Sequence, residues 1–209
     1  MAMRFDPMED GKKATYFRMI ESIVPRPIAW VSTISRAGTH NLAPFSFFTG
    51  VTSDPATLLF CCGNRRNGDP KDTAQNCIDT GVFVVNCSSY SASQQMVQTS
   101  AAYPADIDEF EAAGIDFSPS ETVAAPRVRD AAISFECDCH DITEVKNDEG
   151  CVTSRIIIGR IKLIHIDDAV LDAQGRVDVR ALDAISRLGG HDYARIGEVF
   201  TIPRPKREL

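Results

Sequence analysis

The stretch PIAWVSTISRAGTHNLAPFSFFTGVTS, residues 27–53, holds two apolar runs separated by a turn-rich segment. Residues 27–35 form the first run, which is rich in β-branched side chains, and residues 42–53 form the second. Runs of this composition are typical of β-strands, and RAGTHN between them supplies turn residues. An Asp-Pro pair then breaks the pattern before ATLLFCC, residues 56–62, which predicts a third strand.

The rest of the chain adds further strands and a few short helices. Strands are predicted at residues 81–88, 131–145 and 151–166, and the last two flank a hairpin turn through KNDEG. Start and stop signals predict helices at residues 71–80, 91–103, 105–114 and 179–189. In the helix at 71–80, Asp72 or Thr73 is the expected cap and Gly81 the stop.

These elements lack the regular strand–helix alternation of a parallel sheet. We therefore expect a mainly β fold, an antiparallel barrel with helical insertions. The chain contains no internal repeat, low-complexity tract or convincing linker. Residues 1–209 are accordingly expected to form a single domain.

The composition narrows the classes of function. The chain has 22 Lys and Arg against 29 Asp and Glu, which argues against a general nucleic-acid binder. It has no apolar run of the length that spans a membrane and no apolar stretch of signal-peptide type, so a cytoplasmic location is expected. The seven cysteines are an odd number scattered through strand-like segments, which indicates reduced thiols rather than a disulfide framework.

The tightest cysteine cluster is ECDCHD, with Cys137, Cys139 and His140. Zinc sites usually space paired cysteines two to four residues apart and need a second pair of ligands, which is not found nearby. In a strand, Cys137 and Cys139 share one face and His140 points to the other. Buried core thiols are therefore the favoured interpretation over a metal site, and no metal is expected.

GNRRNGDPKDT, residues 63–73, has the features of an anion-binding loop. Such a loop needs backbone N–H groups that approach closely, basic side chains and a helix N-terminus. The segment supplies two glycines and three basic residues just before the predicted helix: Gly63, Gly68, Arg65, Arg66 and Lys71. It matches no Walker loop, and the chain contains no G-x-G-x-x-G motif. The alternative is a solvated arginine loop.

A second candidate feature is NLAPFSFFTGVTSDP, residues 41–55, in which polar and aromatic side chains alternate. An extended strand of this kind can hold a flat heteroaromatic ring between apolar faces and edge hydrogen bonds. The alternative is an ordinary barrel strand with phenylalanines in the core.

Five motifs in this order resemble the flavin reductase-like family: RPIAWVSTIS, NLAPFSFF, SDP, KDTAQN and GVFVVN. The similarity runs from about residue 16 to about residue 205 and is closest to the branch that contains flavoredoxin-like proteins. The chain departs from the family's Asp-Pro-Pro at Ala56. The resemblance implies an FMN-binding split β-barrel and a homodimer that holds FMN near the subunit interface.

The resemblance also implies which residues contact FMN. The isoalloxazine ring is expected along Asn41, Ala43, Pro44, Phe45, Ser46 and Phe47. The ribityl chain and phosphate are expected along Cys61, Cys62, Gly63, Asn64 and Arg65. The phosphate site is completed by Lys71, Asp72 and Thr73, with Arg26 as a further contact. This phosphate site favours FMN over FAD, because an adenylate would have to leave past Arg65 and Arg66.

The function implied is an NAD(P)H-dependent flavin oxidoreductase, in which NADH or NADPH delivers hydride to flavin N5. The cofactor carries such chemistry, so the resemblance identifies no catalytic side chain. Arg187, His191 and Tyr193 are candidates for the nicotinamide side of the site. The alternative is that His191 and Tyr193 cap a helix end and pack at the dimer surface.

Two other functions remain open. One is a flavoredoxin-like electron-transfer flavoprotein, which takes electrons from a redox partner protein without direct nicotinamide use. The other is a flavin- or heme-binding sensing or storage protein, in which Cys61 and Cys62 are redox-active thiols. These motifs do not encode the electron acceptor or the choice between NADH and NADPH. Nor do they encode the existence of a monooxygenase partner, or whether flavin is a prosthetic group or an exchanging substrate.

Overall fold

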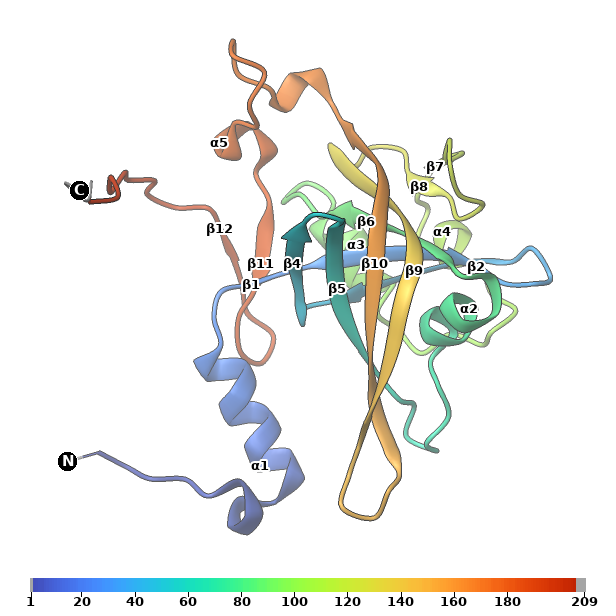
Figure 1. The fold of residues 1–209 in the computed structure, drawn as a ribbon, viewed down its shortest axis with the longest axis vertical. Coiled ribbons are helices and arrows are strands. Elements are labelled where there is room, and N and C mark those ends of the chain that lie inside the picture. Colours follow the sequence, from blue (N-terminus) through green and yellow to red (C-terminus); the bar gives the residue numbers. More distant parts are fainter. Residues whose placement is uncertain (1, 206–209) are drawn as a thin grey trace.

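A seven-stranded antiparallel sheet forms the body of the structure, a computed structural model that describes residues 2–205 (Figure 1). The strands follow the order β3-β2-β6-β9-β10-β5-β4 across the sheet. Their bounds are β2 (Ala29–Ile34), β3 (His40–Phe45), β4 (Phe48–Ser53), β5 (Ala56–Gly63), β6 (Val82–Cys87), β9 (Ile133–Lys146) and β10 (Val152–Ile166). The strand predictions at residues 56–62, 81–88, 131–145 and 151–166 are confirmed to within a few residues.

The sheet curls because its two edge strands are consecutive in the chain. β3 and β4 lie at opposite ends of the strand order, yet only Ser46 and Phe47 connect them. The N–H of Cys61 in β5 donates to the Phe47 carbonyl at 2.8 Å, which holds this link beside β5. The prediction of one continuous strand at residues 42–53 is wrong, since the chain turns at this link.

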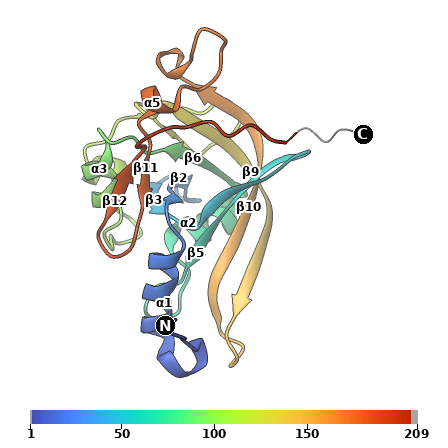
Figure 2. The ribbon, with the colours of Figure 1, turned by 90° about the vertical axis from the view of Figure 1, so that its left-hand side faces the viewer.

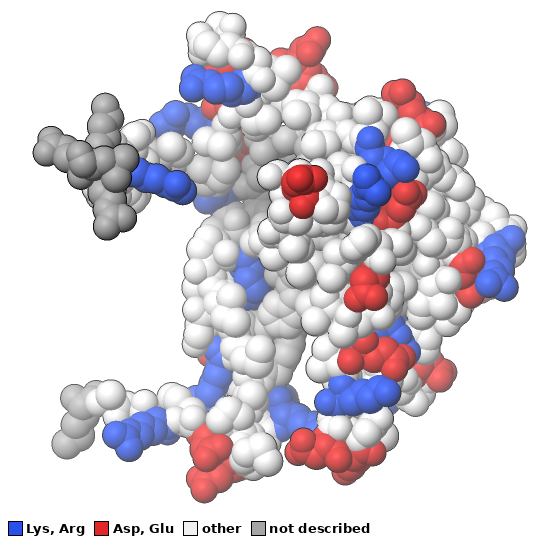
Figure 3. All heavy atoms as spheres, in the orientation of Figure 1, with Lys and Arg blue, Asp and Glu red and all other residues white. Residues whose placement is uncertain are grey.

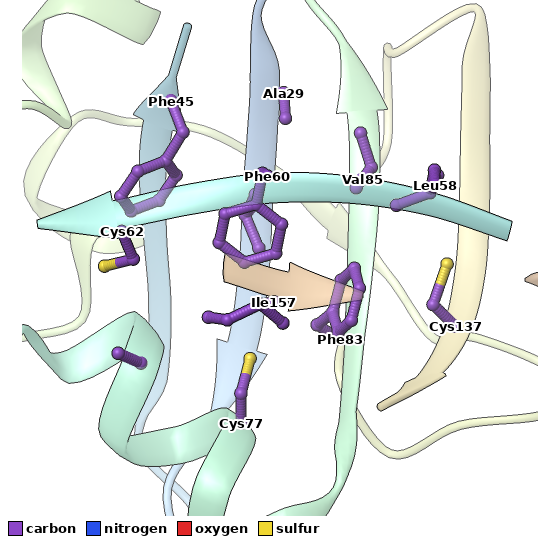
Figure 4. Packing of buried hydrophobic residues seen from close by; sticks show 12 residues of the cluster. Ala29, Phe45, Leu58, Phe60, Cys62, Cys77, Phe83, Val85, Cys137 and Ile157 are labelled. Atoms are coloured by element: carbon purple, nitrogen blue, oxygen red, sulfur yellow. The ribbon is translucent and has the colours of Figure 1, made fainter. Parts of the chain in front are cut away.

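The barrel interior is filled by apolar side chains from most of its strands (Figure 4). The Phe60 ring centroid lies 5.1 Å from that of Phe45 and 5.3 Å from that of Phe83. Helix α2 (Asp72–Thr80) adds Ala74 and Cys77 to the same cluster. It ends at Gly81 with a left-handed backbone (φ 71°), as predicted. α2 therefore caps one end of the barrel.

Strand β2 is buried on both faces, which explains its uninterrupted apolar sequence. Ala29 and Val31 face the barrel interior, whereas Trp30 belongs to a second cluster outside it. That cluster also contains Met96 of α3 (Ser93–Gln98) and Phe110 of α4 (Glu109–Ala112). The helices predicted at residues 91–103 and 105–114 are thus present but shorter than predicted.

The helix predicted at residues 179–189 is mostly wrong. α5 covers only Val179–Leu182 and ends at Asp183, whose backbone is left-handed (φ 45°). The chain then forms β11 (Ile185–Arg187), which pairs with β1 (Arg26–Pro27) and β12 (Tyr193–Arg195) in a small separate sheet. Strand pairing to β1, which is distant in sequence, overrides the local helical pattern.

The chain ends extend away from the barrel (Figures 1 and 2). Helix α1 (Pro7–Ser22), which the sequence reading did not predict, exposes Tyr16, Phe17 and Met19. In the C-terminal tail, Phe200 and Ile202 are 74% and 78% exposed. The small elements β7 (Phe117–Ser118), β8 (Arg127–Val128) and the 3-10 helix η1 (Asp168–Val170) lie in the connections.

Cys137 is fully buried in the core, Cys139 is half-buried against it and His140 is exposed. All seven cysteines are unpaired. Within residues 2–205, no three His, Cys, Asp or Glu side chains gather as metal ligands would, and no helix has the length and apolarity to cross a membrane. Figure 3 shows acidic and basic side chains interspersed over one face.

A buried carboxylate fixes the loop that follows β7 to the long hairpin of β9 and β10. Glu136 is 0% exposed, and its oxygens accept hydrogen bonds from the Glu121 N–H at 2.9 Å and from the Thr122 N–H and hydroxyl at 2.6 Å each. His165 Nε2 lies 2.7 Å from the same carboxylate. Burial alone would raise the pKa of Glu136, but these hydrogen bonds outweigh it and lower the pKa to about 2.

Replacement of this carboxylate should destabilise the protein. We expect Glu136→Gln to lower the free energy of unfolding at pH 7 by about 3 kcal/mol, because an amide nitrogen would face donors in a buried site. In the wild type, stability from this group is present above an unfolded pKa near 4.5 and is lost as the pH falls toward 2. Urea unfolding between pH 2 and pH 7 measures both effects. The exposed Glu149→Gln is the matched control, and equal stabilities of the two variants would contradict the account.

Candidate functional site

A cleft of about 160 Å³ opens beside β3, close to the link that joins the two edge strands. Three parts of the chain that the sequence singled out meet in it: the end of β3, the loop before α2 and the first residues of α2. Eight predicted contact residues line it, namely Asn41, Ala43, Pro44, Phe45, Arg65, Lys71, Asp72 and Thr73. The structure therefore brings the aromatic strand and the basic loop to one place.

A second hollow of about 260 Å³ adjoins the cleft and shares Pro44, Phe45 and Ser100 with it. Ser46, Arg187 and Tyr193, all predicted site residues, line this second hollow. The Arg187 guanidinium carbon lies 4.4 Å from the centre of the Tyr193 ring. Residues predicted to contact the flavin line the cleft, and two of the residues predicted for the nicotinamide side line the hollow that adjoins it.

One end of the cleft is suited to an anion. No side chain caps the N-terminus of α2, where Lys71 holds the cap position, so the backbone N–H groups of the first turn have no side-chain acceptor. Within residues 2–205, no carboxylate oxygen lies within 4.0 Å of the Lys71 ammonium, which lies 5.8 Å from the centre of the Phe45 ring. Arg65 forms an ion pair with Asp72.

The expected capping roles of Asp72 and Thr73 are therefore wrong. Asp72 is the first helical residue, and its carboxylate faces Arg65 instead of the helix N–H groups. The Thr73 hydroxyl accepts a hydrogen bond from Asn41 Nδ2 at 2.9 Å. The same amide also donates to Thr33 at 3.1 Å, so Asn41 fixes the start of α2 against strand β2.

The link beyond β3 offers free backbone donors beside the cleft. Ser46 lines the adjoining hollow, whereas the predicted contact Phe47 lines neither the cleft nor that hollow. Within residues 2–205, neither the Ser46 nor the Phe47 N–H donates a hydrogen bond to another group of the protein. Pro44, which lacks an N–H, is tolerated here because β3 is an edge strand. With the Leu42 N–H bound to Glu109 and no N–H on Pro44, the free backbone donors near this edge lie in the link beyond β3.

Four predicted contacts, Cys61 to Asn64, lie outside the lining of the cleft. Cys62 is 0% exposed and packs inside the barrel, so its side chain does not reach a ligand in the cleft. Burial raises the pKa of Cys61 and raises that of Cys62 to about 11, which disfavours reactive thiolates. Asn64 anchors the loop instead, because its amide donates to the Gly68 and Val152 carbonyls at 2.8 and 2.7 Å.

Arg26, predicted as a further FMN contact, has a structural role. It is 3% exposed, and its guanidinium donates to the carbonyls of Ile20, Ile23 and Leu188 and to the Ser46 hydroxyl. Burial lowers the pKa of Arg26 from its usual value. Since these bonds occupy the guanidinium, Arg26 ties α1 and the β11–β12 turn to the strand link and does not face the anion end of the cleft.

His191 is exposed in the turn between β11 and β12 and lines neither the cleft nor the adjoining hollow. The adjacent Gly189 does permit a close approach, but to α1: a Cβ there would lie 2.6 Å from the Glu21 side chain. Of the three residues predicted for the nicotinamide side, only Arg187 and Tyr193 line the adjoining hollow.

Two parts of the lining were missed from the sequence. The loop at 99–103, directly after α3, forms one wall of the cleft. Its small residues are only a weak indication that a ligand could approach the backbone there. Glu109 of α4 is 5% exposed in the same lining, and its Oε2 accepts the Leu42 N–H at 3.0 Å. Burial raises the pKa of Glu109 to about 7. No local pattern separates it from the exposed acidic residues beside it.

The sequence pattern of the flavin reductase like domain matches residues 21–180. The chain belongs to the flavin reductase-like family. The protein YwrF of Bacillus subtilis (strain 168) is 38% identical over 92% of this chain and 94% of its own length. The resemblance found in the sequence motifs is therefore confirmed, and family membership supports flavin binding and an oxidoreductase role.

Solved structures of the family share the fold. Nitrilotriacetate monooxygenase component B from Bacillus cereus has a TM-score of 0.92 and 32% identity, with 97% of this chain and 99% of that chain covered. The 2-nitrobenzoate 2-nitroreductase NbaA of Pseudomonas fluorescens has a TM-score of 0.86 and 28% identity, with 97% and 96% covered. A protein with a split barrel domain from Shewanella frigidimarina NCIMB 400 has a TM-score of 0.83 and 21% identity, with 98% of this chain and 100% of that chain covered. This likeness confirms the predicted antiparallel split barrel.

Proposed function

We propose that the chain binds FMN in the cleft beside β3 and is an NAD(P)H-dependent flavin oxidoreductase. The observation that carries the proposal is the arrangement of the cleft in a member of this family. A basic, uncapped helix start lines the cleft, and free backbone N–H donors lie in the link beside the hollow that adjoins it. A flat ring with a phosphate-bearing tail matches that arrangement.

Bound flavin supplies the redox chemistry, and the residues of the chain bind and orient it. Lys71 and the first turn of α2 hold the phosphate, and Asn41 keeps Thr73 in place beside it. The N–H groups of Ser46 and Phe47, which have no acceptor among the described residues, would donate to the ring and favour negative charge on it. Arg187 and Tyr193 form the surface that receives the nicotinamide donor.

The barrel is also proposed to act as a homodimer. The apolar side chains exposed on α1 and in the C-terminal tail are suited to a contact between two copies. Sedimentation equilibrium at micromolar protein should then give the mass of two chains, and a monomer mass would contradict this part of the proposal.

Reduction of bound flavin tests the proposed activity. We expect the purified protein, loaded with FMN under anaerobic conditions, to lose its visible flavin band on addition of NADH or NADPH much faster than free FMN does. Bleaching only by dithionite would contradict nicotinamide use and would support an electron carrier that serves a redox partner. A protein that takes up no FMN would contradict the cofactor assignment itself.

The phosphate end has its own test. Lys71→Ala should weaken FMN binding by about 1.5–3 kcal/mol, because it removes a charge-assisted hydrogen bond to the phosphate. Riboflavin, which lacks the phosphate, should bind both proteins equally. Fluorescence titration of each flavin measures the change, and Arg66→Ala is the matched control, since Arg66 is exposed in the same loop and outside the cleft. Equal losses for FMN and riboflavin would show that Lys71 serves the structure of the loop.

A further inference from the structure

We propose that Glu109 sets how tightly the cleft holds a phosphate-bearing flavin, because its neutral acid admits the phosphate and its carboxylate repels it. The inference rests on the proposed function, since it assigns a role to a residue of the same site. Glu109 is therefore a specificity residue, because its protonation state decides whether an anionic ligand is admitted to the cleft.

The position of the carboxyl group carries the inference. Glu109 lines the cleft together with Lys71 and Thr73, the residues assigned to the phosphate. It is 5% exposed, and within residues 2–205 no Lys, Arg or His nitrogen lies within 4.0 Å of its carboxyl oxygens. A buried carboxylate without a cationic partner is costly, and a second anion beside it raises that cost.

Glu109 also has access to solvent from the side away from the cleft. A neighbouring hollow of about 290 Å³ shares Asn41, Asp72 and Glu109 with the cleft, so these three residues form the partition between them. Glu109 therefore stays next to the outer hollow when a ligand fills the cleft.

Burial, assisted by two neighbouring carboxylates, favours the neutral form of Glu109. Burial raises its pKa to about 7, with further increases from Asp72 of α2 and Asp108 of its own helix, against the hydrogen bond from the Leu42 N–H. The other titratable groups that face this region are Arg65 and Lys71 before α2, Tyr103 in the opposite loop, His40 of β3, and the ion pair of Arg36 with Asp79 in the outer hollow. Arg65 and His40 are engaged with the two aspartates, Asp72 and Asp108. Both protonation states of Glu109 are thus populated near neutral pH.

The alternative is that Glu109 has a purely structural role. A single substitution distinguishes that role from the proposed effect of its charge. β3 is an edge strand, and Glu109 accepts the N–H of Leu42 that would otherwise lack a partner. Glutamine keeps a carbonyl oxygen for this N–H but stays neutral at every pH. The variant Glu109→Gln therefore retains the structural bond and removes only the charge.

The test is the dissociation constant of FMN and of riboflavin between pH 5.5 and pH 8.5, for the wild type, Glu109→Gln and Glu111→Gln. Glu111 is an exposed residue of the same helix and serves as the control. The FMN phosphate itself titrates near pH 6, but it does so in all three proteins, so the ratio of wild type to variant isolates Glu109.

For FMN, the ratio of the wild-type constant to that of Glu109→Gln should be near one at pH 5.5 and rise to about tenfold at pH 8.5. The riboflavin ratio and both ratios for Glu111→Gln should stay near one. An FMN ratio that does not change with pH, or equal changes for FMN and riboflavin, would overturn the inference while leaving FMN binding intact. Failure of all three proteins to bind FMN at any pH would instead overturn the proposed function.

Discussion

The structure depends on a connection of two residues between opposite edges of one sheet. β3 and β4 are the first and last strands across the seven-stranded sheet, and Ser46 and Phe47 alone join them. So short a link cannot span an open sheet, because neighbouring strands lie about 4.8 Å apart. The sheet must therefore curl until its edges meet, which encloses the Phe45, Phe60 and Phe83 cluster (Figure 4).

The same closure creates the site. Where the edges meet without pairing, the N–H groups of Ser46 and Phe47 have no strand to bond, and the start of α2 lines the cleft that adjoins the hollow beside Ser46. We call the link of Ser46 and Phe47, with the two strand ends that it joins, the seam. Arg26 holds the seam by donating to the Ser46 hydroxyl and to three carbonyls at the end of α1 and in the β11–β12 turn. Buried polar side chains such as Asn41 and Glu109 then fix the helix and the edge strand around the cleft.

Much of this arrangement is encoded locally. The continuous apolar run of β2 and the hairpin of β9 and β10 predict a sheet whose strands do not alternate with helices. Gly81 was predicted to end α2, and it does so with a left-handed backbone. The basic loop before α2 and the aromatic strand β3 were both identified from residue type. They were brought together by the family resemblance, since nothing local states that residues 45 and 71 share a cleft.

The errors share one cause, which is contact with distant parts of the chain. β11 is a strand because it pairs with β1, although its own sequence continues a helical pattern. The family resemblance placed Arg26 and Cys62 beside FMN, yet backbone carbonyls occupy the Arg26 guanidinium and Cys62 faces the core. Glu109 was overlooked because its burial arises from packing of α4 on β3.

The central claim is that flavin lies in the cleft at this seam, with its phosphate at the start of α2. Amide hydrogen exchange with and without FMN tests it most directly. The account predicts slower exchange in residues 45–48, in residues 71–75 and in the loop at 99–103, and unchanged exchange around the separate hollow lined by Trp30, Gln95 and Asp130. Protection at that hollow, with the seam and α2 unaffected, would contradict it.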